Sequence, residues 1–200
     1  MNRDFTAGVD DYLARLSETL GRLSRGELNT FLNLLVDALE GGRNIYIMGN
    51  GGSAATASHF ASDFNKGLSL GKARRFRMIC LNDNVPTLSA YANDVGYEDV
   101  FVEPLRNFLA PGELVVAISG SGNSRNVLKA VEFANATGAV TVGITGFDGG
   151  ALRLAARHCV LVPIHDMQVT EDIHMVLDHL CYAVLGKFLP SAPVAGAAPG

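Results

Sequence analysis

The sequence predicts an α/β fold, a three-layer α/β/α arrangement with a five-stranded parallel sheet at its centre. Two observations predict it. Short apolar runs rich in Val and Ile alternate with stretches of helical periodicity, which is typical of βαβ units. Segments rich in Gly and Ser directly follow several of these runs, where an open parallel sheet presents the loops that bind ligands. The chain has 200 residues, enough for one such domain over residues 1–190.

Two helices are predicted before the first strand, within residues 1–41. Apolar residues recur at three- and four-residue spacing in both: Leu13, Leu16, Leu20 and Leu23, then Phe31, Leu34, Leu35, Ala38 and Leu39. We expect the break between the helices at Arg25-Gly26. The first helix is amphipathic and has little of its own to pack against. Both an oligomer interface and a plain cap on the domain would use such a helix.

Residues 44–189 carry the alternation of strands and helices. Apolar runs predict strands at Asn44–Met48, Phe76–Leu81, Glu113–Ile118, Ala139–Ile144 and Cys159–Pro163. Helical stretches are predicted at Ala54–Asn65, Thr87–Ala92, Ser124–Thr137, Ala151–Arg157 and Thr170–Leu189. Strands of this composition suit a sheet that is covered on both faces. The Pro-, Ala- and Gly-rich residues 191–200 have no periodicity, and we expect a disordered tail there.

Composition excludes several classes of function. The formal net charge is −4, which argues against general binding to nucleic acid or to an anionic membrane. The three cysteines are an odd number and have no CxxC spacing, and Cys80 and Cys159 lie inside apolar runs, as expected of buried free thiols. The start of the chain has no apolar core of the signal-peptide kind, and no run approaches the ~20 apolar residues of a membrane span. The cytoplasm is the simplest setting.

Three loops follow predicted strands and lead into predicted helices: residues 49–53, 119–124 and 145–150. Glycine lets a backbone approach a ligand closely, and the free N–H groups of a helix N-terminus attract an anion. The second loop adds serine hydroxyls at Ser119, Ser121 and Ser124. Neither of the first two loops reads GxxxxGK[ST] or GxGxxG, which disfavours nucleoside triphosphates and dinucleotides. Gly-Ser loops can simply turn a chain, but two at one sheet edge favour a compact phosphate on a small molecule.

Histidines and carboxylates recur on two predicted helices. His59 and Asp63 are four residues apart and so lie on one helix face, and the last helix carries Glu171, His174, Asp178 and His179. Acid–base chemistry, a metal site and hydrogen-bonded structural histidines are the three roles open to them. Glu171 and His179 are separated by about 12 Å along a straight helix. One ion cannot easily contact both, so either they serve the sites of different subunits or only some of these residues bind.

Five segments occur in a characteristic order: GNGGSAATASHFASDF, YANDVGYEDVF, ISGSGNSRNVLKAVEFA, TGFDGG and EDIHMVLDHL. With these segments the chain resembles the sugar isomerase (SIS) domain family, and within it the phosphoheptose isomerases. The resemblance covers residues 5–189. It implies a flavodoxin-like fold whose N-terminal helices serve oligomerisation, a homotetramer with active sites at subunit interfaces, and a bound zinc ion.

The activity that the resemblance implies is an aldose–ketose isomerase. Sedoheptulose 7-phosphate would be converted to D-glycero-D-manno-heptose 7-phosphate through a cis-enediol. Carried over by position, the substrate contacts are Asn50, Gly51, Gly52, Ser53, Asn93, Asp94, Ser119, Gly120, Ser121, Ser124 and Glu171. The metal ligands are His59, Asp63, Glu171 and His179. Asp63 and His179 form the acid–base pair, with the two roles not assigned between them.

Several positions depart from the family pattern. Asp63 stands where a glutamate is usual, Glu171 where a glutamine is common, and Gly120 where a threonine is frequent. Two further departures are Gly67, where an arginine is often found, and Gln168, where an acidic residue is expected. An isomerase of another sugar phosphate, of five to eight carbons, and a non-catalytic SIS scaffold that binds phosphosugars or proteins are the alternatives. Because both Asp63 and His179 are present, the enzyme is favoured over the scaffold.

Overall fold

The computed structural model describes residues 3–189, so the tail expected at 191–200 lies outside the described residues. Its sheet has five strands in the order β2-β1-β3-β4-β5. All neighbours are parallel, as the sequence predicts. The strands are β1 Asn44–Gly49, β2 Arg77–Cys80, β3 Leu114–Ser119, β4 Val140–Thr145 and β5 His158–Leu161.

The helices before and between the strands are α1 Thr6–Arg22, α2 Arg25–Glu40, α3 Gly52–Ser62, α4 Val85–Asp94, α5 Val102–Phe108, α6 Arg125–Thr137, α7 Gly150–Ala155 and α8 Met167–Phe188. A π turn, η1 Asp63–Gly67, continues α3, and a 3₁₀ turn, η2 Tyr97–Asp99, precedes α5. The break expected at Arg25-Gly26 is wrong by two residues. Ser24 is the N-cap of α2 and its side chain accepts a hydrogen bond from the backbone N–H of Glu27, so α2 already begins at Arg25.

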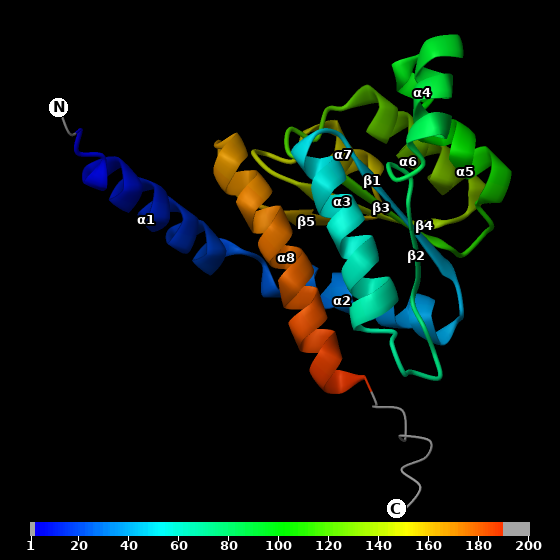
Figure 1. Ribbon diagram of the computed structural model, residues 1–200, viewed down its shortest axis with the longest axis horizontal. Coiled ribbons are helices and arrows are strands. Elements are labelled where there is room, and N and C mark those ends of the chain that lie inside the picture. Colours follow the sequence, from blue (N-terminus) through cyan, green and yellow to red (C-terminus); the bar gives the residue numbers. More distant parts are fainter. Residues whose placement is uncertain (1–2, 190–200) are drawn as a thin grey trace, which may run out of the picture.

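Two hydrophobic cores lie on the two faces of the sheet. Alternate residues of β1 divide between them: Ile45 and Ile47 pack with α2, α3 and α8, and Tyr46 and Met48 pack with α5, α6 and α7. Figure 1 shows the sheet between these helices. The result is the three-layer α/β/α arrangement that the apolar runs predict.

The strand order places a topological switch beside β1. From β1 the chain goes to β2 on one side and then to β3 on the other. The region beyond the carboxyl ends of β1 and β3 is the usual ligand position in open parallel sheets. Gly49 pairs with Ile118 and Ser119 pairs with Thr145, so all three strands end at the same edge.

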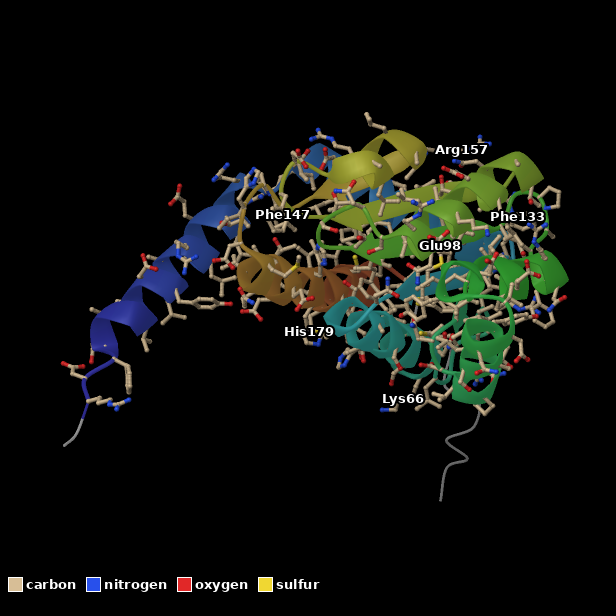
Figure 2. The ribbon with its side chains drawn as sticks, turned by 90° about the horizontal axis from the view of Figure 1, so that it is seen from above. Lys66, Glu98, Phe133, Phe147, Arg157 and His179 are labelled. Carbon is tan, nitrogen blue, oxygen red and sulfur yellow. The ribbon has the colours of Figure 1, made fainter. Side chains whose placement is uncertain are left out.

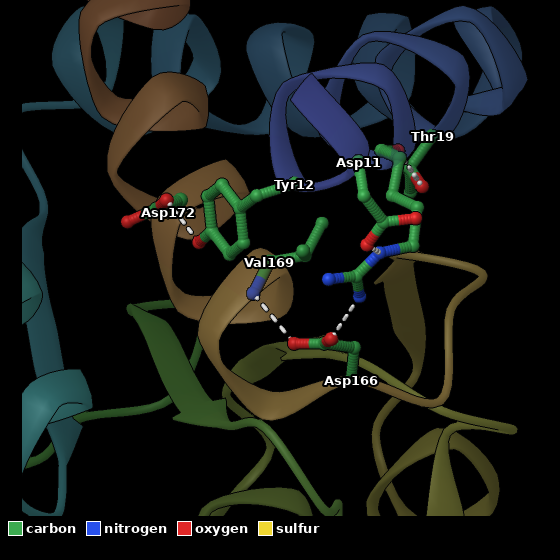
Figure 3. A network of polar contacts seen from close by, with 7 residues as sticks. Asp11, Tyr12, Thr19, Asp166, Val169 and Asp172 are labelled. Carbon is green, nitrogen blue, oxygen red and sulfur yellow. Dashed lines mark hydrogen bonds and ion pairs between the residues drawn. The ribbon is translucent and has the colours of Figure 1, made fainter. Parts of the chain in front are cut away.

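Helix α1 extends away from the body of the molecule and contacts it through α8 (Figure 1). Figure 3 shows the polar contacts: the Tyr12 hydroxyl donates to the Asp172 carboxylate over 2.6 Å, and Arg15 pairs with Asp166. Asp166 also accepts from the backbone N–H of Val169 and so caps α8. The outer part of α1 exposes apolar side chains, at Phe5 68%, Val9 53% and Leu13 55%. Among the described residues, no helix combines the length and apolar character of a membrane span.

Candidate functional site

The loops after β1 and β3 are joined by a pair of asparagines. Asn50 and Asn126 exchange two side-chain hydrogen bonds of 2.9 Å, and the Tyr97 hydroxyl donates to the Asn50 side-chain oxygen over 2.9 Å. Asn126 is buried in the first turn of α6, and Gly51 is the N-cap of α3, with a φ of +54°. These side-chain hydrogen bonds thus tie the loop after β1 to the start of α6 and to η2. Sequence reasoning did not name Tyr97 or Asn126, although both lie inside the quoted family segments.

The loop after β3 gathers three serine hydroxyls at the N-terminus of α6. The Ser119 and Ser124 hydroxyl oxygens lie 3.1 Å apart, and Ser121 accepts from the backbone N–H of Asn123 over 3.3 Å. Ser124 is the N-cap of α6, but its side chain caps no backbone N–H, and the first turn has no acidic residue. The free N–H groups and hydroxyls at this helix end suit a phosphate.

Backbone hydrogen bonds join the serine-rich loop after β3 to the segment that follows β4. The backbone N–H of Gly146 donates to the Gly120 carbonyl over 2.9 Å, and that of Leu152 donates to the Gly122 carbonyl over 2.8 Å. A Cβ at Gly120 would lie 2.6 Å from the Met167 sulfur. The threonine that is frequent at this position in the family would therefore require Met167 to move.

Glu171 lies over the start of α3. A Cβ on Gly52 would lie 2.6 Å from a Glu171 carboxylate oxygen, so any larger residue there would require the Glu171 side chain to move. A carboxylate at a helix N-terminus is stabilised by the helix dipole and by the free N–H groups. Two sequence-predicted substrate residues, Gly52 and Glu171, are thus brought together, and Ser53 is buried in the adjacent helical turn.

Asn93 and Asp94 lie at the exposed end of α4, which contacts the turn η2 that carries Tyr97. Their side chains bond to each other over 2.7 Å. Helix α4 has no buried residue and projects from the body (Figure 1). The contact of these two residues with a sugar stays a prediction.

A cluster of two histidines and two aspartates lies where α8 passes α3. His59, Asp63, Asp178 and His179 each offer one ligand atom, and these atoms all lie within 4.8 Å of one another. The Nε2 atoms of the two histidines are 3.2 Å apart. Figure 2 shows His179 at this junction, on the side away from the sheet. Helix α3 supplies His59, and the π turn that continues it supplies Asp63.

The structure brings together three of the four sequence-predicted metal ligands and adds Asp178. Glu171 is not in this group. Asp178 is fully buried, and burial, reinforced by the negative charge of Asp63, raises its pKa to about 7. The sequence contained a signal for it, because Asp178 lies among apolar residues on a helix that is buried over much of its surface.

The donor set of this cluster fits a divalent metal. Imidazole nitrogens and carboxylate oxygens are ligands that zinc takes in proteins. Both carboxylate oxygens of Asp178 are buried without a hydrogen-bond partner among residues 3–189, and a bound cation would satisfy them. The cluster could therefore hold a metal ion.

His174, four residues before Asp178, is also buried and lies outside the cluster. In the described part of the chain, neither of its ring nitrogens has a hydrogen-bond partner. Burial lowers the pKa of His174 to about 4, so it is neutral near pH 7. It supports α8 from the core side as a neutral imidazole.

The chain is similar to proteins of one family over most of its length. The sequence model described as SIS domain matches residues 4–146. A phosphoheptose isomerase of Geobacter sulfurreducens is 35% identical over 187 residues, 90% of this chain and 98% of that protein. One of Helicobacter pylori is 35% identical over 153 residues, 76% of this chain and 79% of that protein. The solved structure of phosphoheptose isomerase GmhA from Neisseria gonorrhoeae superposes with a TM-score of 0.84 at 25% identity, covering 92% of this chain and 100% of that one.

Proposed function

The chain belongs to the SIS domain family and is a sugar-phosphate isomerase, and we propose that it converts sedoheptulose 7-phosphate to D-glycero-D-manno-heptose 7-phosphate. The observation that carries the proposal is the presence of two complementary parts in one chain. A serine-rich helix N-terminus suits the phosphate, and a cluster of imidazoles and carboxylates suits proton transfer. The relatives are named phosphoheptose isomerases, which supports a phosphorylated heptose as the substrate.

The phosphate end of the substrate would be held by the loop after β3. Ser119, Ser121 and Ser124 offer hydroxyl donors, and the N-terminus of α6 adds free N–H groups and its dipole. Holding a charged group far from the reacting carbons fixes the chain between them and lowers the entropic part of the barrier. Asn50, which is hydrogen-bonded to Asn126, and Glu171, which lies over Gly52, would contact the sugar hydroxyls.

The isomerisation moves one proton between neighbouring carbons. A base removes a proton from the carbon beside the carbonyl, a cis-enediol forms, and the proton returns to the adjacent carbon. Asp63 and His179 are the proposed acid–base pair, and both belong to the cluster at the α3–α8 junction. His59, Asp63 and His179 would hold a zinc ion, which when bound would polarise the carbonyl and hydroxyl oxygens.

We also propose a homotetramer with active sites at subunit interfaces. The side chains of His59 and Asp63 are 44% and 28% exposed, so one subunit alone leaves the reaction centre open to water. An enediol needs a site from which water is excluded. The exposed apolar side chains of α1 at Phe5, Val9 and Leu13 offer a surface for a second copy.

Sedoheptulose 7-phosphate offered to the purified protein in D₂O tests the proposal. We expect the aldose product to carry deuterium at C2, because the transferred proton exchanges with solvent on the base. Turnover of a different sugar phosphate of five to eight carbons, and not of sedoheptulose 7-phosphate, would overturn the substrate assignment. Absence of turnover with sedoheptulose 7-phosphate and with every other sugar phosphate of five to eight carbons would contradict the enzymatic function and favour a non-catalytic binding protein.

A further inference from the structure

We propose that Asp178 is a direct ligand of the metal ion, so that two imidazoles and two carboxylates bind one divalent cation: His59, Asp63, Asp178 and His179. The inference rests on the proposed function, which supplies the metal. It differs from the family resemblance, which puts Glu171 in the ligand set and leaves Asp178 without a role.

The burial of Asp178 carries the first step. Its side chain is 0% exposed on α8, between the buried residues Leu177 and Cys181. Neither carboxylate oxygen accepts a hydrogen bond from any of residues 3–189. A buried carboxylate without a donor or a counter-charge is strongly destabilising. A cation at the cluster would supply the missing partner.

The distances within the cluster carry the second step. The Nε2 atom of His59 lies 3.8 Å from an oxygen of Asp178 and 3.8 Å from an oxygen of Asp63. These separations are too long for hydrogen bonds. Two ligand atoms that share one zinc ion at bonds of about 2.0–2.2 Å lie at most about 4.4 Å apart, and the measured separations are within that limit. The two histidine Nε2 atoms, 3.2 Å apart, are within hydrogen-bond distance of each other, but Asp178 stands beyond that distance from His59, so the bonds within the cluster leave its carboxylate unsatisfied.

Charge carries the third step. Two carboxylates and two neutral imidazoles balance a divalent cation. Glu171 is not needed in the set, because its carboxylate lies against Gly52 at the start of α3. With Asp178 as the fourth ligand, all four residues come from the α3–α8 junction of one subunit. The distance between Glu171 and His179 along the helix then no longer prevents one ion from binding all of its ligands.

The test measures zinc affinity directly, by competition with a chromophoric chelator. We expect Asp178→Asn to weaken zinc binding by about a hundredfold or more, since even loss of a residue that only supports a ligand costs about 10–100-fold. The matched control is Asp172→Asn, an exposed carboxylate on the same helix, which should bind zinc like the wild type. Asp63→Asn is the positive control and should also lose affinity.

A second measurement guards against a variant that fails to fold. We expect metal-free Asp178→Asn to melt at the same temperature as the metal-free wild type or higher, because it removes a buried charge without a partner. Addition of zinc should raise the Tm of the wild type and leave that of the variant unchanged. In Asp178→Cys, a thiolate ligand should produce a charge-transfer band with Co²⁺ that is absent from the wild type, which retains Cys181.

The outcomes separate this inference from the proposed function. If the zinc affinity of Asp178→Asn is within about threefold of that of the wild type, while Asp63→Asn loses affinity, Asp178 is not a ligand but the metal site remains. A wild-type protein that binds neither zinc nor Co²⁺ also overturns it, whatever its turnover. Failure of the proposed function is a different result, absence of sugar-phosphate turnover, and is read from the wild-type enzyme alone.

Discussion

Helix α8 carries carboxylates in two contrasting environments. Toward its N-terminal end, Asp166 accepts from the backbone N–H of Val169 and pairs with Arg15, and Asp172 accepts from the Tyr12 hydroxyl. In its middle, Asp178 is buried, and neither of its oxygens has a hydrogen-bond partner among the described residues. The pKa values follow: the backbone bond from Val169, then Arg15, lowers the pKa of Asp166, whereas burial raises that of Asp178 to about 7.

The contrast separates the structural part of the helix from the functional part. Carboxylates with partners are satisfied by the protein itself and hold α1 against the body of the molecule. A carboxylate without partners, next to two histidines and a second aspartate, is unsatisfied until something else binds. We therefore expect mutations in the middle of α8 to have the largest effects and mutations at its N-terminal end to have the smallest.

The largest effect is expected for His179→Ala in the cluster. Turnover of sedoheptulose 7-phosphate should fall by about a thousandfold or more, because a general acid or base is lost. Binding of the substrate, measured by calorimetry, should persist, since the phosphate loop is untouched. His158→Ala, an exposed histidine on β5, is the control. Wild-type turnover in His179→Ala would remove His179 from the mechanism.

A smaller effect is expected at His174, which is buried on α8 but outside the cluster. Its pKa is lowered from 6.5 to about 4 in the folded protein. The unfolded chain therefore binds the proton first, and stability is lost as the pH falls from 6.5 toward 4. Between about pH 7.5 and about pH 4.5 the wild type should lose on the order of 2–3 kcal/mol more than His174→Asn.

Urea unfolding of both proteins at the two pH values measures this difference. The absolute stability of His174→Asn is not the readout, because the substitution also alters core packing. Parallel pH profiles for the two proteins would show that His174 is not held neutral by burial.

The smallest effect is expected at the N-terminal end, for Tyr12→Phe. The substitution removes one exposed hydrogen bond to Asp172, which should cost about 1 kcal/mol or less of unfolding free energy. Zinc affinity should not change, since the site is in the middle of the helix. Asp172→Asn keeps an acceptor oxygen and should cost less still. A loss of zinc binding in Tyr12→Phe would contradict the separation of α8 into a structural N-terminal end and a metal-binding middle.

Local patterns in the sequence predicted most of the fold. The apolar runs identified the five strands, and the loops after β1 and β3 meet at one sheet edge as expected. Two short elements went unpredicted, η2 and α5, because helices of three and seven residues leave little periodicity to detect, and α5 includes Pro104. The break before α2 was misplaced because the capping role of Ser24 was overlooked.

The site was harder to predict, because its composition depends on which helices pack together. His59, Asp63 and His179 could be predicted because they lie at positions where the resemblance implies metal ligands. Asp178 joins them only because α8 lies beside α3. The bonds of Asn126 and Tyr97 to Asn50 likewise join residues 76 and 47 positions apart. Such long-range contacts leave no periodic signal. The contacts of Asn93 and Asp94 and the cytoplasmic setting stay predictions.

The most direct test of the metal-dependent reaction centre is the turnover of sedoheptulose 7-phosphate by metal-stripped protein, measured before and after addition of zinc. The cluster of imidazoles and carboxylates at the α3–α8 junction predicts that turnover is lost on stripping and returns with zinc. Full turnover by the stripped protein would contradict it, and would leave Asp63 and His179 to act as an acid–base pair alone.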